Sequence, residues 1–389
     1  MEQKFVFTDE SIEVDSRTLF RIKAVKTFGN VKEGDLGGFL ESTKNLSHAG
    51  KCWVYDNACV YDSAKVFDNA KIIDNARVYG SASVYNDAII KDNSKVCENA
   101  EVYEDAIVSD NAIIYCNALI YGNARIRNNS SVFGDVRVYD YAYLHDNVRV
   151  LRKAKVYGSA TLSDYAEVSG YAKVYDHAKL KGRCYISDNA VVDGRSIISD
   201  ESKVTDDAVI TGKSKVSGFS IISGHALIKD SELDLNVLAG NHVVITNSSV
   251  EGSCRIFHNA IIENTEIIGE CDITKDAYIT SRKDYITMRG FGKEQGSVTY
   301  YKCKDGTIRV NRGCFSGTLD KFEEAVRERR SGKIAEEYLK AIELVRYHFS
   351  DETVETKKLE EKQEKLSPID KLIQKRAKSL QKKLNKDRG

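Results

Sequence analysis

Residues 54–90 read VYDNACVYDSAKVFDNAKIIDNARVYGSASVYNDAII, and every sixth residue of this stretch is Val or Ile. The same register continues without a break from Val54 to Ile228, and all thirty of its positions are Val, Ile or Leu. Two residues before each aliphatic stands Ala, Ser or Cys, with Val136 and Val148 as exceptions. An internal period held over this length indicates a repeat architecture.

Each six-residue unit combines a short strand with a turn. The aliphatic residue and the small residue two places before it point to the same side of a strand, so both are predicted to be buried. Asp or Gly, often followed by Asn or Ser, comes next, as at Asp56-Asn57. These residues tolerate the positive φ angles of tight turns. Three strands and three turns predict a triangular coil of 18 residues, with coils stacked about 4.8 Å apart.

The pattern of an aliphatic residue followed four places later by a small one resembles the hexapeptide-repeat family of left-handed β-helices. The resemblance covers residues 51–285. It implies a mainly β protein: a left-handed parallel β-helix (solenoid) with a small β N-terminal cap and a small α+β C-terminal module. A right-handed β-helix, as in bactofilin-like filament proteins, is the alternative.

Stacked coils predict columns of like residues at a period of 18, and two such columns occur in the sequence. One column would line a corner with amides that bond along the axis, and it comprises Asn57, Asn75, Asn93, Asn111, Asn129 and Asn147. The other would line an outer face with aromatic rings, and it comprises Phe67, Tyr85, Tyr103, Tyr121, Tyr139, Tyr157 and Tyr175.

The register slips after Ile228. We expect an irregular segment at residues 233–241, from Leu233 to Asn241. The repeat is then expected to resume in a new phase, and to shift once more, with these buried aliphatics: Val244, Val250, Ile256, Ile262, and then Ile267, Ile273 and Ile279.

Four segments follow from these patterns. Residues 1–50 are predicted to form an N-terminal β cap, and residues 51–285 the β-helix. Residues 286–350 are predicted to form an α+β C-terminal cap, because an uncovered solenoid end invites polymerisation. Residues 351–389 are expected to be a charged helical or disordered tail. Within the C-terminal cap, Asp305-Gly306 predicts a hairpin turn, and Thr318 is a candidate helix N-cap.

Composition narrows the functional classes. Lys plus Arg and Asp plus Glu each number 58, so no net charge draws the chain to nucleic acid. The first ten residues lack the features of a signal peptide, no apolar run could span a bilayer, and the nine cysteines are scattered without a CxxC pair. We therefore expect a cytoplasmic protein of a bacterial host, with no membrane partner. The spacing of the seven histidines predicts no metal site.

An outward surface supplies the candidate binding residues. Residues on either side of a buried aliphatic face outward together, which sets a basic column beside an aromatic one. The candidate ligand- or partner-binding residues are Tyr121, Tyr139, Tyr157 and Tyr175 with Arg137, Lys155 and Lys173. Aromatic rings flanked by cations suit a nucleotide, a nucleic-acid strand or an acidic protein. The same residue types also suit any exposed strand, or self-association into a homo-oligomer, possibly a trimer.

An enzymatic function is the alternative hypothesis to a binding surface. The hexapeptide-repeat resemblance implies an acyltransferase that uses acyl-CoA and a histidine base. His242, next to the irregular segment, would be the first candidate for that base and His145 the second; a surface or turn histidine is the plain interpretation of each. CoA is expected only under this reading, and no cofactor otherwise.

Three functional hypotheses remain open. The entry Gly34-Asp-Leu-Gly-Gly-Phe and the segment Gly313-Cys-Phe-Ser-Gly-Thr-Leu resemble uncharacterised hexapeptide-repeat proteins of phages and prophages, and the entry also resembles putative acyltransferases. The first hypothesis is a non-catalytic binding scaffold, a phage accessory protein that binds a host protein or sequesters a small anionic ligand such as a signalling nucleotide. The second is an acyltransferase, and the third is a structural self-assembling protein.

Overall fold

The computed structural model describes residues 2–292 and 295–350, so the expected tail at 351–389 lies outside the described residues. The chain divides into two compact units. Of the described residues, unit 1 comprises 2–290 and 295–316, and unit 2 comprises 291–292 and 317–350. Unit 1 is a parallel β-solenoid of thirteen coils, which confirms the predicted architecture; its left-handed sense stays a prediction.

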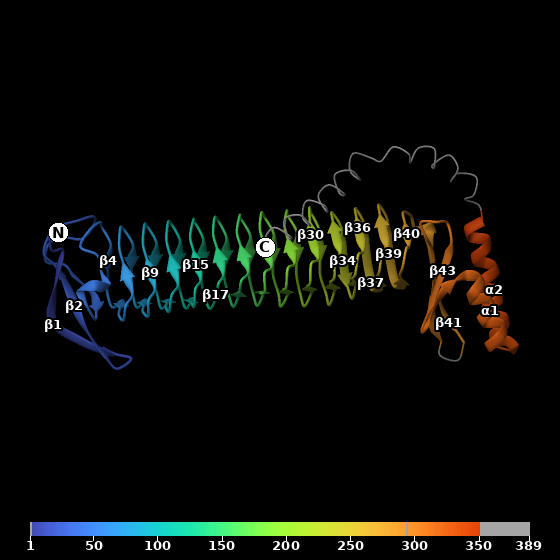
Figure 1. The fold of residues 1–389 in the computed structure, drawn as a ribbon, viewed down its shortest axis with the longest axis horizontal. Helices are drawn as coiled ribbons and strands as arrows, with labels where there is room; N and C mark the ends of the chain where they lie inside the picture. The colour runs from blue at the N-terminus through green and yellow to red at the C-terminus, as the bar shows by residue number, and fades with distance from the viewer. Residues whose placement is uncertain (1, 293–294, 351–389) are drawn as a thin grey trace, which may run out of the picture. The chain divides into compact units, whose positions relative to one another are not determined.

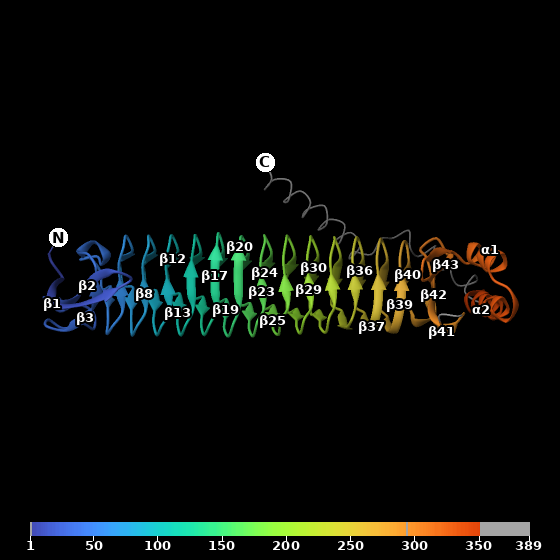
Figure 2. The same cartoon turned by 90° about the horizontal axis from the view of Figure 1, so that it is seen from below.

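Each coil contributes one strand to each of three flat faces, which we name A, B and C, and the coils follow one another along one axis (Figures 1 and 2). Face A consists of β4 Trp53–Val54, β7 Lys71–Ile72, β10 Ile89–Ile90, β13 Ile107–Val108, β16 Arg125–Ile126, β19 Tyr143–Leu144, β22 Thr161–Leu162, β25 Lys179–Leu180, β28 Ile197–Ile198, β31 Lys215–Val216, β34 Glu232–Leu235, and the first parts of β37 Ser249–Ile256 and β39 Glu266–Ile273.

Face B follows face A in each coil. It consists of β5 Cys59–Val60, β8 Arg77–Val78, β11 Lys95–Val96, β14 Ile113–Tyr115, β17 Ser131–Gly134, β20 Arg149–Arg152, β23 Glu167–Val168, β26 Tyr185–Ile186, β29 Lys203–Val204, β32 Ile221–Ile222, β35 Leu238–Ala239, and the second parts of β37 and β39.

Face C completes each coil as a parallel sheet of 13 strands. It consists of β6 Lys65–Val66, β9 Ser83–Val84, β12 Glu101–Val102, β15 Leu119–Ile120, β18 Arg137–Val138, β21 Lys155–Val156, β24 Lys173–Val174, β27 Val191–Val192, β30 Val209–Thr211, β33 Leu227–Lys229, β36 Val244–Thr246, β38 Ile261–Glu263 and β40 Tyr278–Ile279.

The interior is made by the two residue types that the repeat predicts. Ala58 and Val60 are both fully buried, as are their counterparts in successive coils. Burying apolar surface at about 25 cal/mol per Å² stabilises coils whose strands are only two residues long. The solenoid therefore depends on stacking rather than on any single strand.

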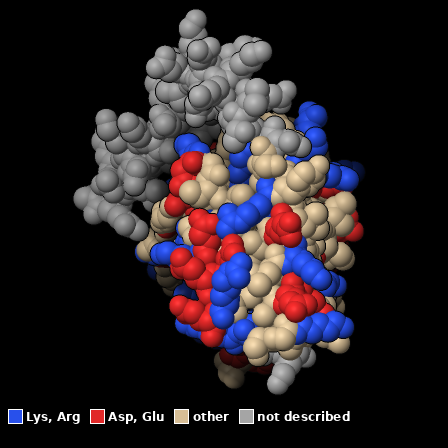
Figure 3. Space-filling view, turned by 90° about the vertical axis from the view of Figure 1, so that its right-hand side faces the viewer, with Lys and Arg blue, Asp and Glu red and all other residues tan. Residues whose placement is uncertain are grey.

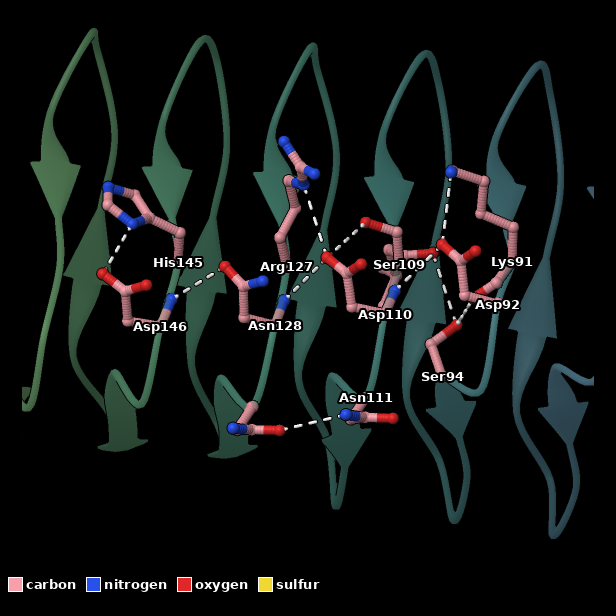
Figure 4. Close-up of polar contacts among 12 residues, drawn as sticks. Lys91, Asp92, Ser94, Ser109, Asp110, Asn111, Arg127, Asn128, His145 and Asp146 are labelled. Carbon is pink, nitrogen blue, oxygen red and sulfur yellow. Dashed lines mark hydrogen bonds and ion pairs between the residues drawn. The ribbon is translucent and has the colours of Figure 1, made fainter.

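The three corners AB, BC and CA carry the turns, and at many of them an Asp, Glu or Asn side chain accepts a backbone N–H of the next coil. Asp110 has a φ of 59°, in the left-handed region. Its carboxylate accepts a hydrogen bond at 2.9 Å from the backbone N–H of Asn128, the residue at the same place one coil later. The row continues through Asn128, whose side-chain oxygen accepts from the backbone N–H of Asp146 at 3.1 Å (Figure 4). Asp and Asn thus satisfy the turn geometry and a neighbouring backbone donor together.

The predicted amide ladder on corner AB is confirmed from Asn75 to Asn147. Successive side chains donate Nδ2–H to Oδ1 over 3.1–3.5 Å, as from Asn111 to Asn129. The ladder ends where Tyr165 takes the next position.

The prediction of an irregular segment at residues 233–241 is wrong. β34 pairs in register with β31, placing Leu233 beside Val216, and β35 places Ala239 beside Ile222. Coils now repeat every 17 residues, because corner CA has lost one residue in each of the last coils. The prediction that Val244 is buried is wrong for the same reason: Ile245 pairs with Ile228 and is fully buried.

An antiparallel N-terminal cap, as expected, covers the first coil. β1 Phe5–Val14 pairs with β2 Arg17–Ala24, β2 pairs with β3 Leu36–Leu40, and β3 then runs parallel to β5. Gly38 makes this crossing possible, since a Cβ atom there would lie 2.4 Å from the carbonyl oxygen of Ala58.

Side-chain hydrogen bonds join this cap to the first turns. η1 Thr43–Asn45 follows the crossing strand, and the Asn45 amide donates to the carbonyls of Asp62 and Ala64 at 3.0 and 2.9 Å. Lys4 is buried, and its Nζ donates to the carbonyl oxygen of Cys52 at 2.9 Å. The strand edge of the first coil is thereby covered.

A small sheet follows the last coil. Its order is β41 Tyr285–Phe291, β42 Gly296–Lys302, β43 Ile308–Arg312 and β44 Phe315–Thr318, after η2 Arg282–Asp284. The hairpin between β42 and β43 turns at Asp305-Gly306, as predicted. The Asn311 side chain donates to the carbonyl oxygen of Asp272 at 2.9 Å, so this sheet satisfies backbone groups of the last coil.

Unit 2 contains the two helices, α1 Leu319–Arg329 and α2 Gly332–Ser350. The Thr318 hydroxyl caps α1 by accepting from the N–H of Lys321, as predicted. Phe322 and Tyr338 meet edge to face at 5.8 Å between the helices. Cationic and anionic side chains are interspersed on the surface in Figure 3. Within the described residues, no helix is long and apolar enough to span a membrane.

Candidate functional site

The aromatic column on face C forms a continuous stack. Rings from Phe67 to Tyr175 lie face to face, with centroids 4.7–4.9 Å apart and planes within 6° of parallel. The predicted stacking is therefore confirmed, with Tyr121, Tyr139 and Tyr157 in its interior. Each interior ring has a neighbour on both faces, so only ring edges and hydroxyl groups point away from the solenoid.

Carboxylates flank the stack near both of its ends. The Tyr85 hydroxyl donates to Glu101 Oε2 at 3.0 Å, and the Tyr175 hydroxyl donates to Asp193 Oδ2 at 2.7 Å. Asp193 occupies the column position that follows Tyr175. Burial, with help from these carboxylates, raises the pKa of both phenols. Burial and the neighbouring tyrosines raise the pKa of Tyr139 to about 12. The stack is therefore uncharged near neutral pH.

The predicted basic column lies beside this stack. Lys155 pairs in register with Arg137 on one side and Lys173 on the other. Arg137 and Lys173 are exposed, and Lys155 is half-buried. No carboxylate in the described part of the chain forms an ion pair with any of the three. Three adjacent coils thus offer cationic donors next to phenol oxygens, although the binding role of these residues stays a prediction.

Beyond the aromatic stack, face C carries apolar side chains in the column of Lys173, whereas the column of Tyr175 continues with Asp193, Thr211 and Lys229. The residue just before each buried aliphatic is half-buried and hydrophobic in the last six coils, and these residues are Val191, Val209, Leu227, Val244, Ile261 and Tyr278. Sequence reasoning missed this second column because it concentrated on the aromatic residues. Reading the position before each buried aliphatic, first every 18 and then every 17 residues, would have found it.

The other two faces differ from face C. On face B, the position after the buried aliphatic becomes polar in the second half, with Ser169, Ser187, Thr205 and Ser223. On face A, the same position carries Lys91, Ser109, Arg127 and His145 in successive coils (Figure 4). Face B also carries stacked rings in its first half, Tyr61 on Tyr79 and Tyr115 on Phe133, but Cys97 interrupts them. The unbroken stack from Phe67 to Tyr175 therefore distinguishes face C as the candidate interaction surface.

The two candidate catalytic histidines lie apart, on different faces of the solenoid. His145 projects from face A, and its Nδ1 lies 2.8 Å from Asp146 Oδ2 (Figure 4). His242 is exposed on corner BC and stacks on His225, with ring centroids 4.9 Å apart. Asp207 lies 3.6 Å from the Nδ1 of His225. The structure brings His242 together with His225, a partner that the sequence did not indicate.

A hollow of about 720 Å³ lies over the shortened corner CA. Ser231, Ser248 and Thr265 line it in successive coils, and Lys213 and Arg282 lie among its other lining residues. Arg282 is ion-paired with Glu266. Neither His145 nor His242 lines this hollow. Within residues 2–292 and 295–350, no group of three or more His, Cys, Asp or Glu side chains could hold a metal ion.

The fold and this surface define the class as a capped parallel β-solenoid with one hydrophobic face. No family model matches the sequence, and no curated protein matches it.

Proposed function

We propose that this protein is a non-catalytic binding scaffold that presents face C to a protein partner. The observation that carries the proposal is the pair of hydrophobic columns on face C: a stack of aromatic rings after the buried aliphatics as far as Tyr175, and half-buried apolar side chains before the buried aliphatics from Val191 onward. Aromatic residues and Arg are enriched where proteins bind each other, and extended apolar patches mark such sites.

A flat protein surface suits face C better than a nucleotide does. Base stacking needs an open ring face, whereas each interior tyrosine is covered on both faces by rings less than 5 Å away. The edges and hydroxyl groups that remain can contact a surface that lies across them. The cations beside the stack, which form no ion pair within the described part of the chain, favour acceptor groups on that surface.

We extend the proposal to the cellular environment and the biological role of the protein. All nine cysteines are free thiols, which supports a reducing, cytoplasmic environment. The resemblance to hexapeptide-repeat proteins of phages and prophages supports an accessory role in a bacterial host. The acyltransferase alternative would need a substrate hollow beside a histidine, and neither His242 nor His145 lines the hollow at corner CA.

Capture from host lysate tests the proposal with the full chain immobilised. We expect the wild-type chain to retain one or more proteins that the double variant Tyr139→Ser/Tyr157→Ser does not retain, because the variant removes two rings from the stack. Thr205→Lys, at the equivalent position of face B, is the matched control and should retain the same proteins as the wild type.

Circular dichroism must show that all three proteins keep the β-solenoid. Equal retention by the double variant and the wild type would contradict face C as the binding surface. Release of a bound nucleotide or acyl-CoA on denaturing the purified protein would also contradict the proposal, in favour of a small-ligand function.

A further inference from the structure

We infer that the protein partner of face C docks through a short acidic segment, which crosses corner BC and reaches the ring stack past Arg137, Lys155 and Lys173. This inference deepens the proposed function and rests on it, because it names the chemistry of the partner at one edge of the same surface. The charge pattern of corner BC and an unusual turn in its middle coil support it.

A compact group of cations lies where corner BC meets face C. We call it the basic patch, and it comprises the two turn residues of corner BC and the residue before the buried aliphatic of face C, in three successive coils. Its nine positions are residues 134, 135, 137, 152, 153, 155, 170, 171 and 173. They carry a single carboxylate, that of Asp135, and five cations: Arg137, Arg152, Lys153, Lys155 and Lys173.

The cations of the basic patch are available to a partner. Lys155 is half-buried, and the other four are exposed. No ion pair joins any of the five to a carboxylate of the described residues, whereas the neighbouring Arg149 is neutralised by Glu167 at 3.0 Å. Asp135 accepts a hydrogen bond from the side-chain amide of Asn117 at 2.9 Å. The patch therefore has a net positive charge.

The same edge of the solenoid is acidic on both sides of the basic patch. The equivalent positions of the three preceding coils carry Glu98 and Glu101 and no Lys or Arg. Those of the three following coils carry Asp188, Asp206 and Asp207, again without Lys or Arg. An anionic partner is thus attracted to a stretch of only about 10 Å along the axis and repelled beyond it. A short acidic segment that crosses the edge fits this pattern, whereas a long polyanion such as a nucleic-acid strand along the axis does not.

The middle coil of the basic patch departs from the repeat at Arg152. In the first ten coils, the residue at this turn position is Asp, Asn, Glu or Gly at every corner except at Cys116 and Arg152. Arg152 has a φ of 68°, in the left-handed region that a long side chain disfavours. Its neighbours in the same column, Gly134 and Gly170, offer it no carboxylate. Unfavourable backbone conformations of this kind are concentrated at functional positions.

The turn at Arg152 also leaves a backbone donor without its usual acceptor. At corner CA, Asp140 Oδ2 accepts a hydrogen bond from the backbone N–H of Gly158, one coil later, at 3.1 Å. Gly170 stands in the same relation to Arg152 and has a φ of 67° against 68° for Gly158. A guanidinium cannot accept a hydrogen bond, and the described residues provide no acceptor for the N–H of Gly170. A carboxylate supplied by a partner suits this turn, because a carboxylate of the chain itself occupies the equivalent place at other turns.

Lys153 adds a second cation beside this turn. Its Nζ donates to the hydroxyl oxygen of Tyr171 at 3.4 Å and lies over the Tyr171 ring, 5.3 Å from the centroid. An ammonium group has three donors, so Lys153 can also bind a partner's carboxylate. Because the ammonium lies over one face of the ring, Tyr171 is less suited to stack a nucleobase.

A segment that crosses the basic patch continues onto the ring stack. Tyr157 lies five residues after Arg152 in the same coil, which is roughly 16 Å of extended chain. Acidic side chains over Arg152, Lys153 and Lys155 would be followed by apolar side chains over the edge of Tyr157. The charged contacts would orient the segment, and the apolar contacts would remove hydrophobic surface from water.

Fluorescence anisotropy of the full chain with a defined peptide tests the inference. The probe is the labelled peptide Glu-Asp-Glu-Asp-Ser-Leu-Ser-Leu, and the neutral control is Gln-Asn-Gln-Asn-Ser-Leu-Ser-Leu. We expect the acidic peptide to bind at least about tenfold more tightly than the neutral one, and we expect salt to weaken its binding. Equal affinity for the two peptides overturns the inference.

The variant Arg152→Asp/Lys153→Asn places residues typical of the repeat at both turn positions. It should weaken binding of the acidic peptide at least about tenfold. Its melting temperature should equal or exceed that of the wild type, because the new carboxylate can accept from the N–H of Gly170. Lys179→Asp/Lys181→Asn on face A changes the charge by the same amount and is the matched control, which should bind as the wild type does. Equal loss of binding in the two variants overturns the inference, because net charge would then be the cause.

A single-stranded oligothymidylate of similar length tests the other class of polyanion. We expect the wild type to bind it more weakly than the acidic peptide. Tighter binding of the oligothymidylate, lost in Arg152→Asp/Lys153→Asn, would assign the basic patch to nucleic acid and overturn the inference.

The two proposals fail separately. If the peptides bind equally and the Tyr139→Ser/Tyr157→Ser variant still fails to retain lysate proteins, the acidic segment is wrong and the scaffold function of face C stands. If the acidic peptide binds as expected and that variant retains the same lysate proteins as the wild type, the proposed function of face C is wrong and the basic patch alone binds acidic segments.

Discussion

At the scale of single residues, hydroxyl side chains replace a lost turn bond in the shortened corner CA. In a six-residue corner, the small residue donates its backbone N–H within its own turn, as Ser196 does to the carbonyl oxygen of Asp193 at 3.3 Å. In the five-residue corners, the N–H of Ser248 bonds instead to Ser231 Oγ at 3.1 Å, and that of Thr265 to Ser248 Oγ at 3.2 Å. This corner therefore needs Ser or Thr where other corners accept Ala.

Ser248→Ala should lower the free energy of unfolding by about 1–3 kcal/mol, because it leaves the buried N–H of Thr265 without an acceptor. Ser196→Ala is the matched control in the same corner. The Ser196 hydroxyl is buried and has no hydrogen-bond partner among residues 2–292 and 295–350, so its loss should change stability by less than about 0.5 kcal/mol. Urea denaturation measures both; equal effects would show that the hydroxyl ladder does not stabilise the corner.

At the scale of the element, the tyrosine stack on face C links stability to alkaline pH. A phenol whose pKa is raised on folding holds its proton while the unfolded chain, with a pKa of about 10, releases it. Its stabilising contribution is therefore complete below about pH 10 and is lost as the pH rises through the folded value. For Tyr139, burial and neighbouring tyrosines set that folded value at about 12.

Replacing Tyr121, Tyr139 and Tyr157 by Phe should leave the stack in place but remove three of its ionisable groups. We expect the wild type to lose thermal stability between about pH 10 and pH 12 more steeply than the triple variant. Their stabilities near neutral pH should be similar. Melting curves over this pH range measure the difference, and parallel profiles would mean that the stacked phenols are not linked to folding.

At the scale of the whole molecule, two periods are superimposed. The buried core repeats every six residues, whereas the asparagine and tyrosine columns repeat every 18. Repeat proteins are stabilised by contacts between neighbouring repeats. A deletion of 18 residues keeps both periods, whereas a deletion of six residues keeps only the period of the core. Comparing the two deletions separates the contribution of the columns to stability from that of the core.

Deletion of residues 92–109 removes one coil and rejoins Tyr85 to Tyr121 in the stack, so we expect a folded protein with a small loss of stability. Deletion of residues 92–97 keeps the core pattern but shifts every later column to another face. It should cost no more than about 1 kcal/mol extra, because Tyr85 loses Tyr103 from its stack while Tyr103 moves over Tyr79 and Asn99 over Asn75, so a ring pair and an amide pair form again at the junction. Comparing the two by chemical denaturation tests this, and a much larger loss for the six-residue deletion would mean that the new pairs do not replace the original ones.

The sequence does not determine which side chain is buried where two aliphatic residues are adjacent. Val244 and Ile245 are both compatible with a buried position, and a slip of one residue turns every side chain of a strand to the opposite face. The six-residue step also mispredicts residues 233–241, since a five-residue corner changes the spacing of the buried residues without interrupting the coil. Only the pairing of Leu233 with Val216 shows that the strands continue.

The order of aliphatic, small and turn-forming residues by itself determined that this chain forms a stacked β-coil, because a two-residue strand is stable only when its buried side chains repeat in register. Tertiary structure decided the rest. It set which of the three outer faces collects the hydrophobic row, how the tyrosine rings cover one another, and where the 17-residue coils open a hollow. Those properties depend on which residues, 17 or 18 places apart, become neighbours across the coils.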